Sequence, residues 1–212
     1  GISSHSVVIR IRLLYDTKTV GHSGTLDPLA TGVLPVMLNR AVKASEYLKD
    51  HDKSYRAGIL LGLCTDSGDI SGNVISRFEG VLPDFERFKE AAQRFVGSFM
   101  QTPPMYSALK VGGVKLVKLA RQGIEVAREA REVHVHSLRP FESGGVFYMD
   151  VDCSKGTYIR TLCEDIGAAL GCGATMLSLE RRRVGDYGIE LAYSLERLAE
   201  MDDGARAGAL IP

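Results

Sequence analysis

The sequence lacks the features that would place this chain in or across a membrane. No run of about eighteen apolar residues, the minimum for a membrane-spanning helix, occurs in it. No basic stretch followed by an apolar one resembles a signal peptide. We therefore expect neither a membrane span nor a leader, and we expect a cytoplasmic protein.

Cysteine is scarce and widely spaced. The four cysteines, Cys64, Cys153, Cys163 and Cys172, form no C-x-x-C pair, and no histidines cluster beside them. A zinc site and a disulfide framework both need closer or more regular spacing. We expect reduced thiols that fill the core of a cytoplasmic protein.

The chain also lacks net charge, because 26 basic residues balance 26 acidic ones. The overall charge therefore gives no support to a nucleic-acid partner. Its distribution is uneven, since segment 101–131 carries a net charge of +4 and segment 186–212 carries −4. Such segregation fits a polyanion bound on one face, although a solvated helix face also produces a run of like charges.

The chain has enough apolar material for a sizeable core, 45% of its residues. Helical and strand periodicities alternate along it without an internal repeat, which favours an α/β or α+β architecture. The patterns predict helices from Ser3 or Ser4 to Leu14, and over 40–48, 84–96, 115–122 and 157–170. Strands are predicted at 55–61, 133–135 and 147–153, and the last two bracket a turn at Gly144-Gly145. Glycines at 97, 123 and 171 are expected to end three of the helices, and Arg160 falls just off the buried stripe of the last one.

Residues 21–32, GHSGTLDPLATG, form the least ordinary stretch of the chain. A phosphate-binding P-loop needs a lysine after its last glycine, but Val33 follows Gly32, so that class of site is excluded. Pro28 restricts Asp27 to an extended backbone, and the glycines permit sharp turns. The Asp27 carboxylate can thus be held at a fixed outward angle. The ordinary alternative is an aspartate that only caps a turn.

The string GHSGTLDPLATGVLP resembles the catalytic signature of the bacterial tRNA pseudouridine-55 synthases, the TruB family. The resemblance continues through DKSYR at 52–56, QTPPMYSALK at 101–110 and GTYIRTL at 156–162, and then through 171–174 and 179–182. It implies the pseudouridine-synthase fold, an α+β fold with a mixed, largely antiparallel central sheet and flanking helices. It further implies that 1–212 is one catalytic domain, without the family's N-terminal strand and C-terminal RNA-binding module.

The resemblance assigns roles to individual residues. Asp27 matches the catalytic aspartate and Arg160 the arginine of its ion pair, whose guanidinium would keep the carboxylate ionised. Substrate-binding roles fall on Tyr55, which matches the tyrosine stacking on the target base, and on His22, Tyr158 and Leu179. Each has an ordinary alternative. Arg160 is equally typical of a surface helix cation, His22 of a solvated loop, and the other three of core packing.

The reaction implied by the resemblance breaks the bond between uracil N1 and ribose C1′, turns the base and joins C5 to C1′. No group enters or leaves, so we expect no cofactor and no metal. Asp27 either attacks C1′ or removes a ribose proton, and the residues do not choose between these routes. The implied partner is the T-arm stem-loop of tRNA, bound by a monomer that flips the target base and holds the phosphates with segment 101–131.

Two departures from the family pattern, Ser6 and Val117, lie outside the proposed pocket. Three other functions stay open at this point. The chain could bind or fold RNA without turnover, or act with a guide RNA inside a ribonucleoprotein. A nucleotide-binding metabolic enzyme is the third, although the lysine that it needs is missing from the glycine-rich loop.

Overall fold

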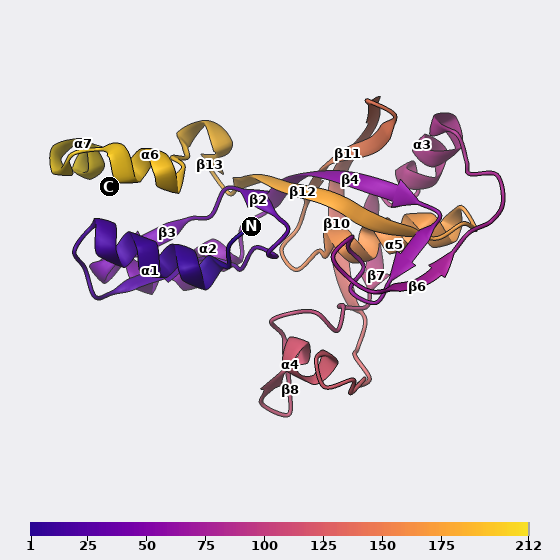
Figure 1. Cartoon of the computed structure of the whole chain (residues 1–212), viewed down its shortest axis with the longest axis horizontal. Coiled ribbons are helices and arrows are strands. Elements are labelled where there is room, and N and C mark those ends of the chain that lie inside the picture. The colour runs from indigo at the N-terminus through magenta and orange to yellow at the C-terminus, as the bar shows by residue number, and fades with distance from the viewer. Residues whose placement is uncertain (212) are drawn as a thin grey trace. The chain divides into compact units, whose positions relative to one another are not determined.

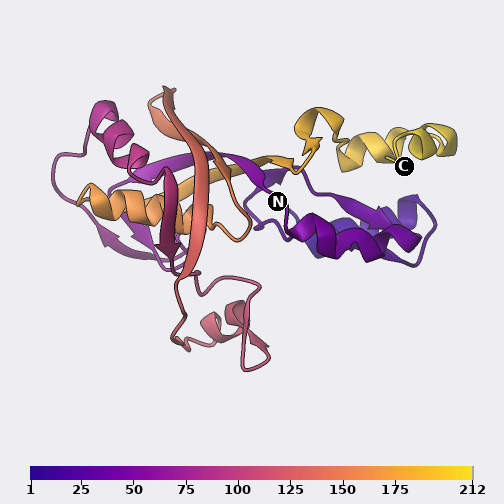
Figure 2. The same cartoon turned by 180° about the vertical axis from the view of Figure 1, so that it is seen from behind.

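The computed structural model describes residues 1–211, and its backbone divides into two compact units (Figures 1 and 2). The first unit consists of residues 1–53 and the residues from Glu180 onward, and the second consists of Ser54–Leu179. Within the described residues, no helix combines the length and the apolar character that crossing a membrane requires.

The first unit contains mostly helices and short strands. Its elements are α1 (Ser4–Leu14), β1 (Val20–His22), β2 (Thr31–Gly32), β3 (Val36–Leu38), the 3-10 helix η1 (Asn39–Ala44), α2 (Ser45–Lys49), β13 (Tyr187–Gly188), η2 (Ile189–Leu191), α6 (Leu195–Glu200) and α7 (Asp203–Gly208). Helix α1 begins as predicted, because the Ser3 hydroxyl accepts a hydrogen bond from the Ser6 amide at 3.0 Å. Residues 40–48 are helical, as predicted, but they form two elements rather than a single helix. The 3-10 helix η1 precedes α2 there, and neither element begins with a side-chain capping hydrogen bond.

The core of the first unit lies between α1, the β1–β3 pair and α6. Its buried members are Val8, Ile11, Val20 and Leu198. Val8 and Ile11 are three residues apart, so they lie on the same face of α1. This confirms the apolar stripe that the sequence predicts for this helix.

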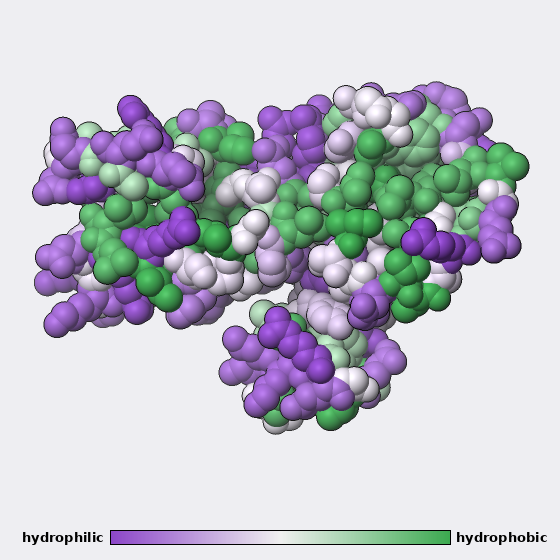
Figure 3. Space-filling view, viewed as in Figure 1, coloured by the Kyte–Doolittle hydropathy of each residue, from purple (hydrophilic) through white to green (hydrophobic). Residues whose placement is uncertain are grey.

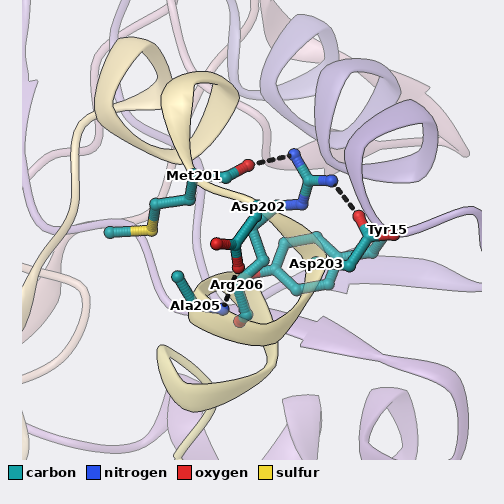
Figure 4. Close-up of polar contacts among 6 residues, drawn as sticks. All are labelled: Tyr15, Met201, Asp202, Asp203, Ala205 and Arg206. Carbon is teal, nitrogen blue, oxygen red and sulfur yellow. Dashed lines mark hydrogen bonds and ion pairs between the residues drawn. The ribbon is translucent and has the colours of Figure 1, made fainter.

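Polar contacts join α1 to the C-terminal helices of the same unit (Figure 4). The Tyr15 hydroxyl donates to the Arg206 carbonyl at 3.1 Å, and Arg206 Nη1 donates to the Met201 carbonyl at 2.9 Å. The Asp202 carboxylate caps α7 by accepting from the Ala205 amide at 2.8 Å. Burial raises the pKa of Tyr15, so its hydroxyl remains a donor at neutral pH.

The second unit is built on a sheet. Its elements are β4 (Lys53–Leu61), β5 (Leu63–Thr65), β6 (Val74–Arg77), α3 (Phe85–Gln93), β7 (Gly97–Gln101), β8 (Lys110–Val111), β9 (Val114–Lys115), α4 (Leu116–Ala120), β10 (Arg131–Ser143), β11 (Val146–Cys153), α5 (Ile159–Ala169) and β12 (Ala174–Val184). The strand order is β12-β4-β11-β10-β7. Strand β12 continues into the first unit, where it pairs antiparallel with β13 and parallel with β2. The sheet is therefore mixed and largely antiparallel, as predicted.

The centre of the sheet is the long hairpin of β10 and β11. Gly144 and Gly145, with φ of 58° and 74°, form the two-residue turn that the sequence predicts. Alternate side chains on both strands point into the core. The buried ones are Val133, Val135, Leu138, Met149, Val151 and Cys153. Two-residue periodicity thus located both strands, although β10 extends well beyond the predicted residues 133–135.

Helices α3 and α5 contact one another in the second unit, and α3 packs on β10 (Figures 1 and 2). Phe88 of α3 stacks on Phe147 of β11 with ring centroids 5.1 Å apart. Helix α3 ends at Gln93, earlier than the predicted Val96. Gly97, expected to end the helix, has a φ of 105° and instead begins β7.

Helix α5 buries Ile159, Leu162, Cys163 and Ile166 of the predicted stripe, whereas Leu170, also predicted, is its partly buried C-cap residue. Two details of the prediction are wrong. The helix begins at Ile159 rather than at Thr157, whose hydroxyl donates to the Ser154 carbonyl at 3.0 Å, and Tyr158 is the N-cap residue. Arg160 is not off the buried face, since only 4% of it is exposed.

Candidate active site

The six residues singled out by sequence lie in both units. Asp27 and His22 belong to the first unit, and Tyr55, Tyr158, Arg160 and Leu179 belong to the second. Each unit is described by itself below.

The glycine-rich segment of the first unit is anchored by strand pairing at both ends. Strand β1, which contains His22, pairs antiparallel with β3. Strand β2 pairs in parallel with Glu180 and Arg181 of β12. The Val33 amide extends this second pairing by donating to the Arg181 carbonyl at 2.7 Å. Residues 23–30 therefore form a loop between two fixed strands.

The guanidinium of Arg181 ties the two ends of this loop together. It donates through Nε to the Val33 carbonyl at 2.8 Å and through Nη2 to the Gly24 carbonyl at 3.3 Å. Arg181 is 2% exposed, so these bonds compensate for the removal of a charge from water. Sequence reasoning assigned no role to Arg181. A signal was present, because Arg181 lies two residues after Leu179 and so shares its face of a strand.

Asp27 is partly exposed, and its backbone is held on both sides. The Ala30 amide donates to the Asp27 carbonyl at 2.9 Å, which closes a turn over residues 27–30. Before it, the Leu26 amide donates to the hydroxyl of Ser4 in α1 at 3.0 Å. The expectation of a carboxylate on a fixed loop agrees with this local geometry.

His22 has a pKa lowered from 6.5, first by burial and then by the positive charge of Arg181. Its Nδ1 atom is buried, as is the hydroxyl of Ser23, and neither has a hydrogen-bond partner within residues 1–211. Because the charged form is disfavoured, the imidazole is neutral at pH 7. His22 is therefore not the freely solvated loop histidine that was its ordinary alternative.

Arg160 of the second unit is held by two carbonyl groups from distant segments. Its Nη1 donates to the Ser67 carbonyl at 2.8 Å, and its Nη2 donates to the Tyr106 carbonyl at 2.6 Å. Tyr106 belongs to the segment QTPPMYSALK and Arg160 to GTYIRTL. The fold thus brings together two of the segments that carry the family resemblance, and the surface-cation alternative for Arg160 is wrong.

The loop after β5, which supplies the Ser67 carbonyl, is itself rigidly bonded. The Asp69 carboxylate accepts hydrogen bonds from the Ser67 hydroxyl and the Ser71 amide, both at 3.0 Å. The Thr65 hydroxyl donates to the Asp69 carbonyl at 2.7 Å. Sequence reasoning missed this loop, although its run of Asp, Ser and Gly residues is typical of a structured turn.

The other three predicted residues occupy strand and helix-start positions. Tyr55 lies on β4 and is partly exposed, and Tyr158 is the N-cap residue of α5. Leu179 on β12 is 8% exposed, as a core residue would be. Contact between these side chains and a base stays a prediction. Among the described residues, no three His, Cys, Asp or Glu side chains are grouped so as to hold a metal ion.

Two solved structures contain a chain with a similar fold. The chain is similar to a chain of a solved Cbf5-Nop10-Gar1 complex, with a TM-score of 0.69 and 30% identity over 92% of this chain and 50% of that one. A chain of an H/ACA RNP bound to a substrate RNA containing 2′-deoxyuridine has a TM-score of 0.67 and 28% identity, covering 92% and 48%. This chain spans about half the length of both solved chains.

Family models and curated relatives make the assignment narrower. Residues 12–159 match the N-terminal domain of the TruB family pseudouridylate synthases, and residues 160–208 match the C-terminal domain of tRNA pseudouridylate synthase B. The tRNA pseudouridine synthases B of Chromohalobacter salexigens and Azoarcus sp. are both 46% identical over 100% of this chain, which covers 69% and 71% of them. The chain belongs to the TruB family of pseudouridylate synthases. This confirms the predicted family, fold and enzyme class, an isomerase of the tRNA pseudouridine synthase type.

Proposed function

We propose that this chain converts the uridine at position 55 in the T arm of tRNA to pseudouridine. The observation that best supports this proposal is the structure of segment 21–35, in which Asp27 lies on a loop held by Ser4 and Arg181. In a member of this family, a partly exposed carboxylate on a rigid loop is suited to act on ribose C1′. Rigidity matters because misplacing a reacting group by about 1 Å can cost on the order of a hundredfold in rate.

Asp27 is the proposed catalytic residue. It either attacks C1′ as the N1–C1′ bond breaks, or removes a ribose proton to start an elimination. In both routes the detached base turns and C5 bonds to C1′, which releases Asp27 from C1′ or follows return of the ribose proton. The C5 proton leaves and N1 gains a proton, so the atoms balance without a second substrate. From the family resemblance, we propose Arg160 as the second catalytic residue and residues 1–212 as one catalytic domain.

The proposed pocket residues act on the flipped base. Extruding a nucleotide costs a few kcal/mol, of which stacking on an aromatic ring returns about 1–3 kcal/mol. Tyr55 is the proposed stacking residue and Leu179 the second packing surface, with Tyr158 at the pocket and His22 at the gap that the base leaves. The neutral state of His22 favours contact with stacked bases rather than with phosphates.

The proposed substrate contact outside the pocket is the basic segment of the second unit. Lys110, Lys115, Lys118 and Arg121 are all exposed. Figure 3 shows hydrophilic side chains gathered over α4 and β8, the part of the molecule that carries them. We place the T-arm phosphates there, bound by a monomer in the cytoplasm. The guide-RNA alternative is not favoured, because the relatives at about 46% identity are tRNA pseudouridine synthases B.

The test is incubation of the purified chain with a T-arm stem-loop. Pseudouridine has the mass of uridine, so it is scored by selective chemical labelling. We expect conversion of the target uridine alone, and none in an RNA with cytidine at that position. RNA binding without any pseudouridine would contradict the proposal and favour a binding module.

Asp27→Asn is the matched test of the catalytic residue. The amide keeps the shape of the carboxylate and removes its charge, so isomerisation should be abolished while RNA affinity stays within about tenfold. Asp186→Asn, at an exposed turn of the same unit, should keep the wild-type rate. Appreciable single-turnover activity in Asp27→Asn would reject Asp27 as the catalyst.

A further inference from the structure

We infer that Gln101 is a positioning residue, whose side-chain amide sets the start of helix α5 and thereby the places of Tyr158 and Arg160. The inference rests on the function proposed above for those two residues. Gln101 is the last residue of β7 and is 2% exposed. It is therefore a nearly fully buried polar side chain, which needs partners to offset its loss of water.

Both partners of Gln101 are backbone groups of one residue. The Tyr158 amide donates to Gln101 Oε1 at 2.8 Å, and Gln101 Nε2 donates to the Tyr158 carbonyl at 3.1 Å. The two residues are 57 positions apart. The side-chain amide thus pairs with Tyr158 as a neighbouring strand would, and only a group with a donor and an acceptor in one plane can do this.

The start of α5 is not capped by the side chain of its own N-cap residue. Tyr158 is its N-cap residue and makes no side-chain capping bond, and Thr157 bonds backward to Ser154. Gly156, with a φ of 81°, lies in the connection from β11. A helix start without a side-chain cap leaves its first amides to find other partners and is less sharply placed. Gln101 supplies the long-range contact that fixes it to β7.

Gln101 and Tyr106 come from the same segment and hold α5 at successive points. The Gln101 amide bonds the backbone of residue 158, and the Tyr106 carbonyl receives the guanidinium of Arg160 at 2.6 Å. Without the Gln101 bonds, the helix start can shift, and the Arg160 guanidinium moves with it. The effect should therefore fall on the chemical step more than on RNA affinity.

The experiment compares Gln101→Met, Gln101→Glu and a control, Gln93→Met. Methionine has similar length but neither donor nor acceptor. Glutamate has the same shape, but at neutral pH it places an acceptor against the Tyr158 carbonyl. Gln93 is an exposed glutamine of the same unit that also donates to a backbone carbonyl, that of Leu138 at 2.8 Å. The readouts are single-turnover rate at saturating T-arm RNA, RNA affinity, thermal stability and hydrogen exchange of the Tyr158 amide.

We expect Gln101→Met to lower the single-turnover rate by about tenfold or more, with RNA affinity changed by less than about threefold. The Tyr158 amide should exchange faster. Gln101→Glu should be slower still, and Gln93→Met should match the wild type. If the Met variant does not fold, Gln101→Asn, which keeps the amide one methylene short, should show the same pattern more weakly.

The inference would be overturned if Gln101→Met kept the wild-type single-turnover rate although its Tyr158 amide exchanged faster. An equal reduction of the rate in Gln93→Met would overturn it too, because the effect would then be general. If the wild type makes no pseudouridine, the proposed function fails instead. In that case the Tyr158 exchange rates still show whether Gln101 holds the start of α5.

Discussion

Arg160 combines a buried charge with a planar set of donors. Burying a cation costs several kcal/mol unless hydrogen bonds compensate. The carbonyls of Ser67 and Tyr106 accept from two different nitrogens of its guanidinium. A lysine keeps the charge but has one nitrogen on a flexible chain, so it cannot reproduce this fork.

We expect Arg160→Lys to keep a small part of the single-turnover activity, roughly a hundredth, because its charge remains but its position changes. Arg160→Met should retain less. Arg139→Met, at an exposed arginine on β10, is the control and should leave the rate unchanged. A near-normal rate in Arg160→Met would show that its carbonyl contacts are structural and that the role taken from the family resemblance does not apply.

The pairing of β2 with β12 decides how the Asp27 loop is held, and Gly32 is the residue that makes it possible. Its φ is 98°, a conformation that side chains other than glycine rarely adopt. A Cβ added there would lie 2.2 Å from the Arg181 carbonyl oxygen. That oxygen belongs to the backbone of β12 and accepts from the Val33 amide, so it cannot move without breaking the pair.

Gly32→Ala should therefore cost more free energy of unfolding than the roughly 1–3 kcal/mol of backbone strain alone. Gly144→Ala is the control, since its φ is 58° and nothing lies within 4 Å of an added Cβ. It should cost about 1–2 kcal/mol. Urea unfolding of both variants measures the difference. Equal costs would mean that the β2–β12 pairing is looser than described.

The charge of the whole molecule is balanced, but segment 101–131 of the second unit carries a net charge of +4. Lys110, Lys115 and Lys118 are exposed there. Phosphate contacts release counterions, so affinity for RNA should fall steeply with salt even in a chain of zero net charge. The distribution of charge, rather than its sum, then decides nucleic-acid binding.

Changing Lys110, Lys115 and Lys118 together to Gln should weaken T-arm binding and flatten its salt dependence. Each phosphate that is no longer neutralised reduces the slope of log affinity against log salt by about 0.7–0.9. The control removes the same charge near α3, by changing Arg87, Lys89 and Arg94 to Gln, all exposed. Titrations at several salt concentrations measure both slopes. An unchanged slope of log affinity against log salt in the first variant would exclude Lys110, Lys115 and Lys118 as phosphate-binding residues.

Sequence alone determined the features that depend on neighbours within a few positions. The Ser3 cap of α1, the Gly144-Gly145 turn and the buried stripe of α5 follow from local hydrogen bonding and periodicity. The signature around Asp27 identified the family for the same reason, since it is one continuous string. Local patterns placed the end of α3 too late, because the amides of residues 94–96 bond to carbonyls three positions back rather than four, and so leave the α-helix.

Only the tertiary structure decided how the candidate site is held. The bonds of Gln101 to Tyr158, of Arg160 to Ser67 and of Arg181 to Val33 join residues 57, 93 and 148 positions apart. In each case the partner is a backbone group, which every residue carries. Such a bond does not depend on the residue type of its partner, so no pattern of side chains could have predicted which carbonyl groups Arg160, Arg181 and Gln101 bind.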